Sequence, residues 1–156
     1  MIIRNCSEED VDKIRIFVSE CKPLDLHTSI TYWTLFKYSP NLCYVMLEND
    51  KVIGFVSGLR SSLEKDVVYL WQIGINKEHR GKSYASTLIE YFIKSAINLN
   101  CNKIQFTIAP ENESSYNAFL KYSKEHSYPI SKMGEAKYYD SLTDKNYFEI
   151  MYQITV

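Results

Sequence analysis

Residues 80–85 read Arg80-Gly81-Lys82-Ser83-Tyr84-Ala85 and join an apolar segment to an amphipathic one. The preceding segment, residues 69–75, predicts a buried strand. After the junction, apolar residues recur at helical spacing: Ala85, Leu88, Ile89, Phe92, Ile93, Ala96 and Ile97. A turn from strand to helix points free backbone N–H groups and the positive end of the helix dipole at one place, which suits a pyrophosphate. Residues 80–85 therefore predict a site for a nucleotide-bearing cofactor, with Arg80 and Lys82 adding positive charge at its rim.

Strand and helix patterns alternate along the rest of the chain. Strands are expected at residues 2–4, 43–47, 52–59, 67–75, 103–108, 130–137 and 148–156, with a loop at 140–146. Helices are expected at residues 11–21, 29–37, 83–99 and 110–124, the first after a cap formed by Ser7 and Asp10. Helices that bracket a strand imply at least one parallel connection. We expect one α/β domain over residues 1–156, a mixed, mostly antiparallel sheet of about seven strands flanked by about four helices.

Composition narrows the classes of function. The chain has 156 residues and a net charge of −1, which gives no electrostatic case for nucleic acid as the principal partner. No apolar stretch approaches the roughly 20 residues of a membrane span, so no membrane partner is expected. The cysteines and histidines show no spacing typical of a metal site or catalytic triad, so no metal is expected. Scattered cysteines without a preceding secretion signal favour free thiols in the cytoplasm.

The element order and the turn at residues 80–85 resemble the GCN5-related N-acetyltransferase (GNAT) family, which binds acetyl-CoA. Arg80 and Ala85 fit the family's turn pattern, whereas Ser83 stands where the family has glycine. The family also has an Asn after the fifth strand and an aromatic residue seven positions on, here Asn112 and Phe119. In many relatives that aromatic residue is a Tyr that protonates the departing thiolate. Phe119 has no such proton, so the role is either empty or taken by water or another Tyr. The resemblance implies acetyl-CoA as co-substrate, in contact with Ile73, Gly74, Ile75, Arg80, Gly81, Lys82, Ser83, Tyr84, Ala85, Asn112 and Phe119.

Further segments resemble one branch of that family, the L-2,4-diaminobutyrate acetyltransferases of ectoine synthesis. The branch is indicated by Pro-Leu-Asp-Leu-His-Thr-Ser at 23–29, Ile-Gly-Phe-Val-Ser at 53–57, Leu-Trp-Gln-Ile at 70–73 and Thr-Ile-Ala-Pro-Glu-Asn-Glu-Ser at 107–114. The likeness runs from about residue 10 to residue 119, and beyond residue 124 only 149–152 match. It implies acetylation of the side-chain (N4) amine of L-2,4-diaminobutyrate, and the relatives suggest a homodimer.

Acetyl transfer from a thioester to an amine proceeds through a tetrahedral intermediate and needs few protein groups. A base must deprotonate the amine, and a backbone N–H, in relatives supplied near the position of Ile73, must stabilise the oxyanion. Glu149 and Asp25 are the candidate bases or ammonium anchors, and Trp71 is a candidate wall or cation–π face. Ser29 and Tyr32, one helical turn apart, are candidates to bind the substrate carboxylate.

Structural roles compete with each of these assignments. Asp25 also fits a helix cap, Trp71 and Tyr32 fit core packing, and Glu149 fits a solvated strand. The 13 tyrosines are explained by packing with a wet hydroxyl, with a pocket or subunit interface as the alternative for Tyr32, Tyr38, Tyr44, Tyr138, Tyr139 and Tyr147. Two other functions remain open: acetylation of another small amine (a polyamine, another diamino acid or an aminoglycoside), or a non-catalytic acyl-CoA-binding module.

Overall fold

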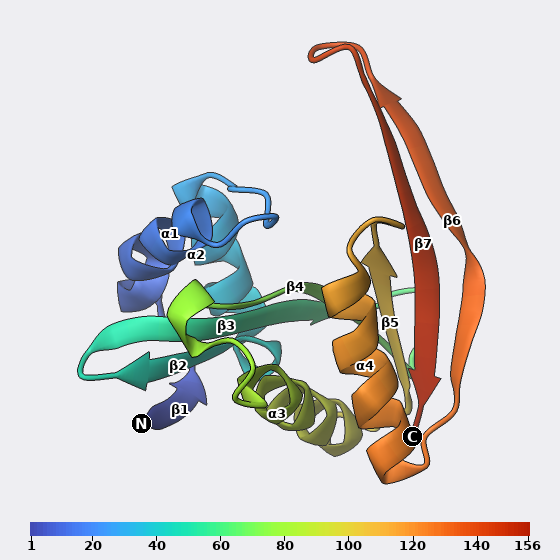
Figure 1. The fold of residues 1–156 in the computed structure, drawn as a ribbon, viewed down its shortest axis with the longest axis horizontal. Helices are drawn as coiled ribbons and strands as arrows, with labels where there is room; N and C mark the ends of the chain where they lie inside the picture. Colours follow the sequence, from blue (N-terminus) through green and yellow to red (C-terminus); the bar gives the residue numbers. More distant parts are fainter.

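The computed structural model describes residues 1–156 and contains one seven-stranded sheet in the order β1-β2-β3-β4-β5-β7-β6 (Figure 1). The strands are β1 (Ile2–Asn5), β2 (Tyr44–Glu48), β3 (Lys51–Arg60), β4 (Val67–Ile75), β5 (Lys103–Ile108), β6 (Ile130–Asp140) and β7 (Lys145–Thr155). The helices are α1 (Val11–Glu20), α2 (Ser29–Tyr38), α3 (Tyr84–Asn98) and α4 (Glu113–His126). Only β4 and β5 pair in parallel, so the predicted mixed sheet with four helices is confirmed.

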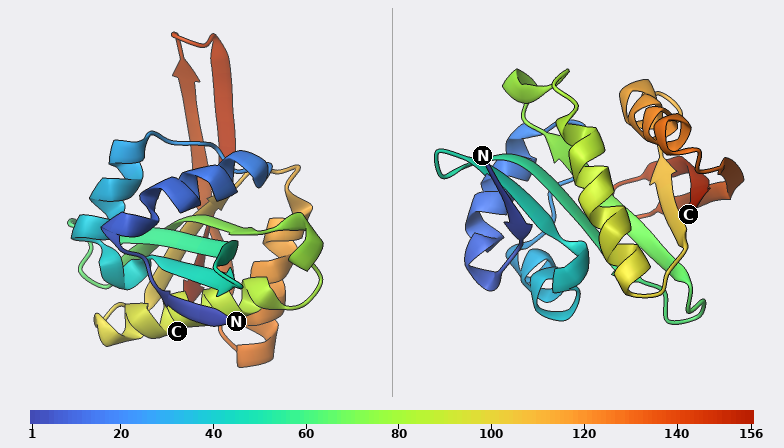
Figure 2. Two further views of the ribbon diagram at one scale, coloured as in Figure 1. Left: turned by 90° about the vertical axis from the view of Figure 1, so that its left-hand side faces the viewer. Right: turned by 90° about the horizontal axis from the view of Figure 1, so that it is seen from below.

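The sheet separates two hydrophobic cores. Helices α1 and α2 cover one face, and α3 and α4 cover the other (Figure 2). Alternation along the strands supplies both cores: Val45 and Phe55 pack under α1 and α2, whereas their neighbours Met46 and Val56 pack under α3. The longest helix, α3, has 15 residues, and none of the helices could span a bilayer.

Strands β4 and β5 stay together for only part of their length. Their parallel pairing joins residues 67–69 to residues 103–105 and goes no further. Beside this point, the register between β3 and β4 shifts at Ser57 and Gly58, and Trp71 on β4 has no partner on β3. Such a bulge bends a strand and reverses the side to which the following residues point. Beyond it β4 diverges from β5, which opens the sheet in its middle (Figure 1).

The last two strands differ from the prediction. The sequence predicts strands at 130–137 and 148–156 around a loop at 140–146, but β6 runs to Asp140 and β7 begins at Lys145. The ladder continues because cross-strand pairs support it: Tyr138 stacks on Tyr147 with ring centroids 4.9 Å apart. The resulting hairpin extends beyond the rest of the sheet (Figure 1).

The predicted cap at the N-terminus is present and includes a third residue. Asp10 is 3% exposed, accepts a hydrogen bond from the Ser7 N–H at 2.8 Å, and pairs with both terminal nitrogens of Arg4 at 2.7 and 2.8 Å. Burial alone would raise the pKa of Asp10, but the hydrogen bonds from Arg4 and Ser7 outweigh it and hold the pKa below its ordinary value.

The substitution Asp10→Asn is expected to lower the free energy of unfolding by roughly 2 kcal/mol at neutral pH, because the buried Asp10 carboxylate loses its two charge-assisted hydrogen bonds from the partly exposed Arg4. A depressed pKa contributes stability above the ordinary carboxyl value and loses it as the pH falls through the folded value. The difference between wild type and variant should therefore shrink below about pH 4. Urea unfolding at several pH values measures it, and a difference that stays constant down to acid pH would contradict the assignment.

Candidate active site

The opening between β4 and β5 joins two clefts. The first, of about 340 Å³, lies between the end of β4, the start of α3, α4 and the loop after α1. The second, of about 760 Å³, lies between β4, β5, the 23–27 segment and the β6–β7 hairpin. Both are lined by Pro23, Leu24, Ile73, Asn112, Ser115 and Phe119. A molecule in the first cleft can therefore contact a molecule in the second through the opened sheet.

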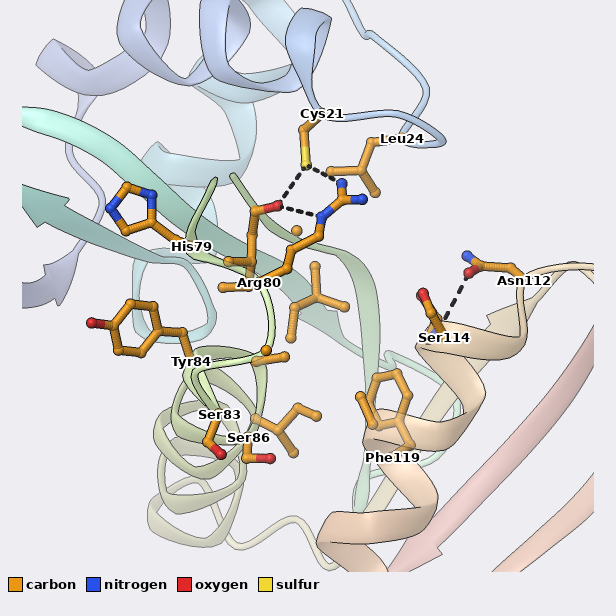
Figure 3. A pocket seen from close by; sticks show the side chains of 18 of the residues that line it. Cys21, Leu24, His79, Arg80, Ser83, Tyr84, Ser86, Asn112, Ser114 and Phe119 are labelled. Carbon is orange, nitrogen blue, oxygen red and sulfur yellow. Dashed lines mark hydrogen bonds between the residues drawn. The ribbon is translucent and has the colours of Figure 1, made fainter. Parts of the chain in front are cut away.

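The turn predicted to hold a pyrophosphate borders the first cleft (Figure 3). Gly81 has φ 77° and Ser83 has φ 61°, the left-handed conformation that favours glycine. Helix α3 begins immediately after Ser83, whose side chain accepts no capping hydrogen bond. The first N–H groups of α3 therefore remain available to an anion in the cleft.

Nearly all residues predicted to contact the cofactor line the first cleft. The exception is Lys82, which is exposed and lies outside the lining. Asn112 caps α4 by accepting a hydrogen bond from the Ser115 N–H, and Phe119 stacks on Phe106 with ring centroids 3.9 Å apart. The lining includes Ile73, Gly74, Ile75, Arg80, Gly81, Ser83, Tyr84, Ala85, Asn112 and Phe119.

The cations around this turn are arranged differently from the sequence-based prediction. The Arg80 guanidinium donates to the backbone oxygens of Ile75 and Lys22, each at 3.1 Å, so two of its donors are engaged within the protein. A lysine from another helix reaches the turn: Lys121 Nζ lies 3.5 Å from Ser83 Oγ and lines the cleft. The sequence reading missed Lys121, although its spacing from Ser114 and Ala118 on α4 is that of one helical face.

The second cleft brings together Asp25, Trp71 and Glu149, which lie on three separate segments of the chain. Trp71 projects into it as the unpaired residue of the bulge, and its ring lies 4.9 Å from that of His27. Asp25 is exposed, and its backbone oxygen accepts a hydrogen bond from Gln72 Nε2 at 2.7 Å. The loop between α1 and α2 (residues 21–28), β4 and β7 therefore each contribute one predicted substrate-binding residue to the same cleft.

Glu149 belongs to a hydrogen-bonded chain that the sequence did not reveal. Thr107 Oγ1 donates to Glu149 Oε2 at 2.8 Å, so the Tyr69 hydroxyl, 2.8 Å from Thr107, donates to Thr107 in turn. Burial raises the pKa of Tyr69, and the Glu149 carboxylate raises it further, which keeps this phenol protonated. The chain holds the carboxylate in place and leaves its second oxygen free of protein partners.

Ser29 and Tyr32 do not line either cleft. Ser29 is exposed at the first turn of α2. Tyr32 is fully buried in the core under α1 and α2, and its hydroxyl donates to Gln72 Oε1 at 3.1 Å. The bulge turns the Gln72 side chain toward α2, where Tyr32 donates to its amide oxygen. Tyr32 thereby orients the Gln72 amide, whose nitrogen donates to the Asp25 backbone oxygen.

The sequence is similar to those of known acetyltransferases. A model of the acetyltransferase (GNAT) family matches residues 11–123. The L-2,4-diaminobutyric acid acetyltransferase of Halalkalibacterium halodurans is 33% identical over 104 residues, which are 67% of this chain and 55% of that protein. That of Halomonas elongata is 28% identical over 132 residues, 84% of this chain and 69% of that protein. The chain thus aligns with little more than half of the Halalkalibacterium protein.

The fold also matches a solved structure. The diaminobutyrate acetyltransferase EctA from Paenibacillus lautus, in complex with its substrate L-2,4-diaminobutyric acid and coenzyme A, matches with a TM-score of 0.86 at 22% sequence identity. The match covers 99% of this chain and 93% of that one. At this identity, the match shows that the two proteins share their fold.

Proposed function

The chain belongs to the acetyltransferase (GNAT) family, and we propose that it transfers the acetyl group of acetyl-CoA to the side-chain amine of L-2,4-diaminobutyrate. One observation carries the proposal: the two clefts meet where β4 leaves β5, and the second holds Asp25, Trp71 and Glu149 together. The names of the two curated relatives support the choice of amine.

Acetyl-CoA fits the first cleft. The N–H groups at the start of α3 suit its pyrophosphate, and Lys121 adds a cation beside Ser83. Beyond residue 69 the β5-facing edge of β4 has no partner strand, so backbone groups near Ile73 suit the amides of the pantetheine arm, whereas the Ile75 oxygen is already engaged by Arg80. In this orientation the thioester reaches the opening shared by both clefts, next to Ile73 and Phe119.

The amine is prepared in the second cleft. Asp25, Glu111 and Glu149 give this cleft three carboxylates, which favour a substrate with two ammonium groups. Glu149 takes one proton from the side-chain ammonium, and the resulting neutral nitrogen attacks the thioester carbonyl. The backbone N–H near Ile73 stabilises the oxyanion. The C–S bond then breaks, and the second proton of the attacking nitrogen passes to the departing sulfur, which leaves the neutral amide and the thiol of coenzyme A. Asp25 holds the second ammonium, and Trp71 packs against the aliphatic carbons.

The experiment that tests this function measures thiol release from acetyl-CoA with a panel of amines. We expect the highest kcat/KM for L-2,4-diaminobutyrate, ahead of ornithine, 2,3-diaminopropionate, lysine, spermidine and an aminoglycoside. Preference for a different amine would contradict the proposed substrate but would still support acetyl transfer to an amine. Bound coenzyme A without thiol release for any amine would favour a non-catalytic acyl-CoA-binding module.

We further propose a cytoplasmic homodimer. The β6–β7 hairpin carries exposed apolar side chains beyond the sheet, including Tyr138, Tyr139 and Leu142, which suit a contact with a second copy. Sedimentation equilibrium tests the dimer, with a mass twice the 18.3 kDa of the chain expected.

The proposed compartment follows from the cysteines: all four are free and buried, which suits a reducing environment.

A further inference from the structure

We propose that Arg80 is a positioning residue for the amine: it fastens the 21–28 loop, which carries Asp25, to the end of β4. This inference rests on the proposed function for its kinetic test alone. Arg80 belongs to the turn predicted to bind the cofactor, but this role concerns binding of the amine substrate.

The contacts of the guanidinium carry the first step. Arg80 Nε donates to the oxygen of Ile75 on β4, and Nη2 donates to the oxygen of Lys22 in the loop, each at 3.1 Å. Nη2 also lies 4.0 Å from Cys21 Sγ, which lies 3.6 Å from the Ile75 oxygen (Figure 3). A planar guanidinium has several fixed donors and can hold two carbonyl groups at once, which a lysine ammonium does with far less directionality.

The loop fits against β4 at one glycine. A Cβ atom at Gly74 would lie 2.7 Å from Leu24 Cδ1 and 2.8 Å from Cys21 Sγ, so the loop rests directly on the strand backbone. A second attachment follows within the same loop, where Gln72 Nε2 donates to the Asp25 oxygen. Arg80 and Gln72 therefore fix the loop at two places, on either side of Leu24.

The loop connects the two clefts. Lys22 lines only the first cleft, Pro23 and Leu24 line both, and Asp25 lines only the second. Releasing the Lys22 oxygen frees the segment whose far end presents the Asp25 carboxylate to the amine. Since the N–H groups of α3 and Lys121 remain beside the phosphates, the loss of Arg80 should affect the amine more than the cofactor.

The test compares Arg80→Gln and Arg80→Lys with the control Lys121→Gln. Lys121 is also a cation of the first cleft, but it does not contact the 21–28 loop. We expect both Arg80 variants to raise the KM of the amine by about tenfold and to leave the Kd of coenzyme A within about threefold. Lys121→Gln should show the reverse, a weaker Kd for coenzyme A with little change in the KM of the amine. A tenfold weaker Kd in Arg80→Gln that Arg80→Lys restores would overturn the proposal, since charge on the phosphates would then explain Arg80.

Hydrogen exchange provides a readout that needs no turnover. The Leu24 amide, which donates to the Cys21 oxygen at 3.0 Å, should exchange faster in both Arg80 variants and at the wild-type rate in Lys121→Gln. Unchanged exchange in the Arg80 variants would overturn the proposal even if the activity changed. If the wild-type protein acetylates no amine in the panel, the exchange result still decides whether Arg80 holds the loop, so failure of the function and failure of this inference remain distinguishable.

Discussion

Replacing Glu149 by Gln is expected to lower kcat for amine acetylation by about 100- to 1,000-fold, with the KM of acetyl-CoA within about threefold of wild type. The amine arrives mostly as an ammonium ion, and Glu149 is the carboxylate of the second cleft that a defined hydrogen-bonded chain holds in place. Glutamine preserves the shape and accepts the Thr107 hydrogen bond, but it cannot accept the proton. Steady-state kinetics at neutral pH measure the loss.

Two controls separate proton transfer from simple positioning. Thr107→Val keeps the carboxylate and removes its hydrogen-bond donor, so a smaller loss of about tenfold is expected. The Glu149→Gln rate should also rise by roughly tenfold per pH unit above neutrality, because more of the amine is then neutral in solution. A Glu149→Gln variant that keeps a third or more of the wild-type kcat at neutral pH would rule out Glu149 as the base.

Gly58→Ala is expected to lower the free energy of unfolding by about 3 kcal/mol or more. A Cβ atom at this position would lie 2.4 Å from the backbone oxygen of Tyr69 and 2.5 Å from the Phe92 ring, and neither has room to move. Gly58 is at the β3–β4 register shift, next to the last β4–β5 pair, so the strain falls where the sheet opens. Urea unfolding followed by circular dichroism measures it.

The neighbouring residue supplies the matched control. Ser57 is fully buried, and its hydroxyl has no hydrogen-bond partner, so Ser57→Ala removes a polar group that gains nothing from burial. Its effect on unfolding should stay within about 0.5 kcal/mol or be slightly stabilising. Equal stability of Gly58→Ala and wild type would mean that β3 and β4 rearrange freely, which would contradict a bulge fixed by close packing.

Much of the fold is readable from the chain because local patterns determine it. Sequence patterns predict β4 and β5 at their observed bounds, and the helical spacing that follows the turn at 80–85 predicts the start of α3 within a residue. Sequence patterns predict a shorter β6–β7 hairpin, with a loop at 140–146, than the structure contains. Its strands continue through cross-strand contacts such as Tyr138 on Tyr147, which single-strand patterns do not contain.

The site was only partly readable. Asp25, Trp71 and Glu149 were found through sequence resemblance, and the structure brings all three to one cleft. The role of Arg80 depends on its contact with Lys22, 58 positions away in the sequence, and that of Tyr32 on its contact with Gln72, 40 positions away. Hydrophobic periodicity carries no information on contacts between residues so far apart in the chain. The β4 bulge decides where Trp71 and its neighbours point, and a strict two-residue alternation could not predict it.

The most direct test of the proposed function is the position of the transferred group. The purified protein is incubated with L-2,4-diaminobutyrate and acetyl-CoA labelled with ¹³C in the acetyl carbonyl, and the product is examined by NMR. We predict a single product in which the labelled carbonyl is bonded to the side-chain nitrogen, formed in equal amount to the released thiol. Label on the α-nitrogen, or no acetylated product from protein that binds coenzyme A, would contradict the account.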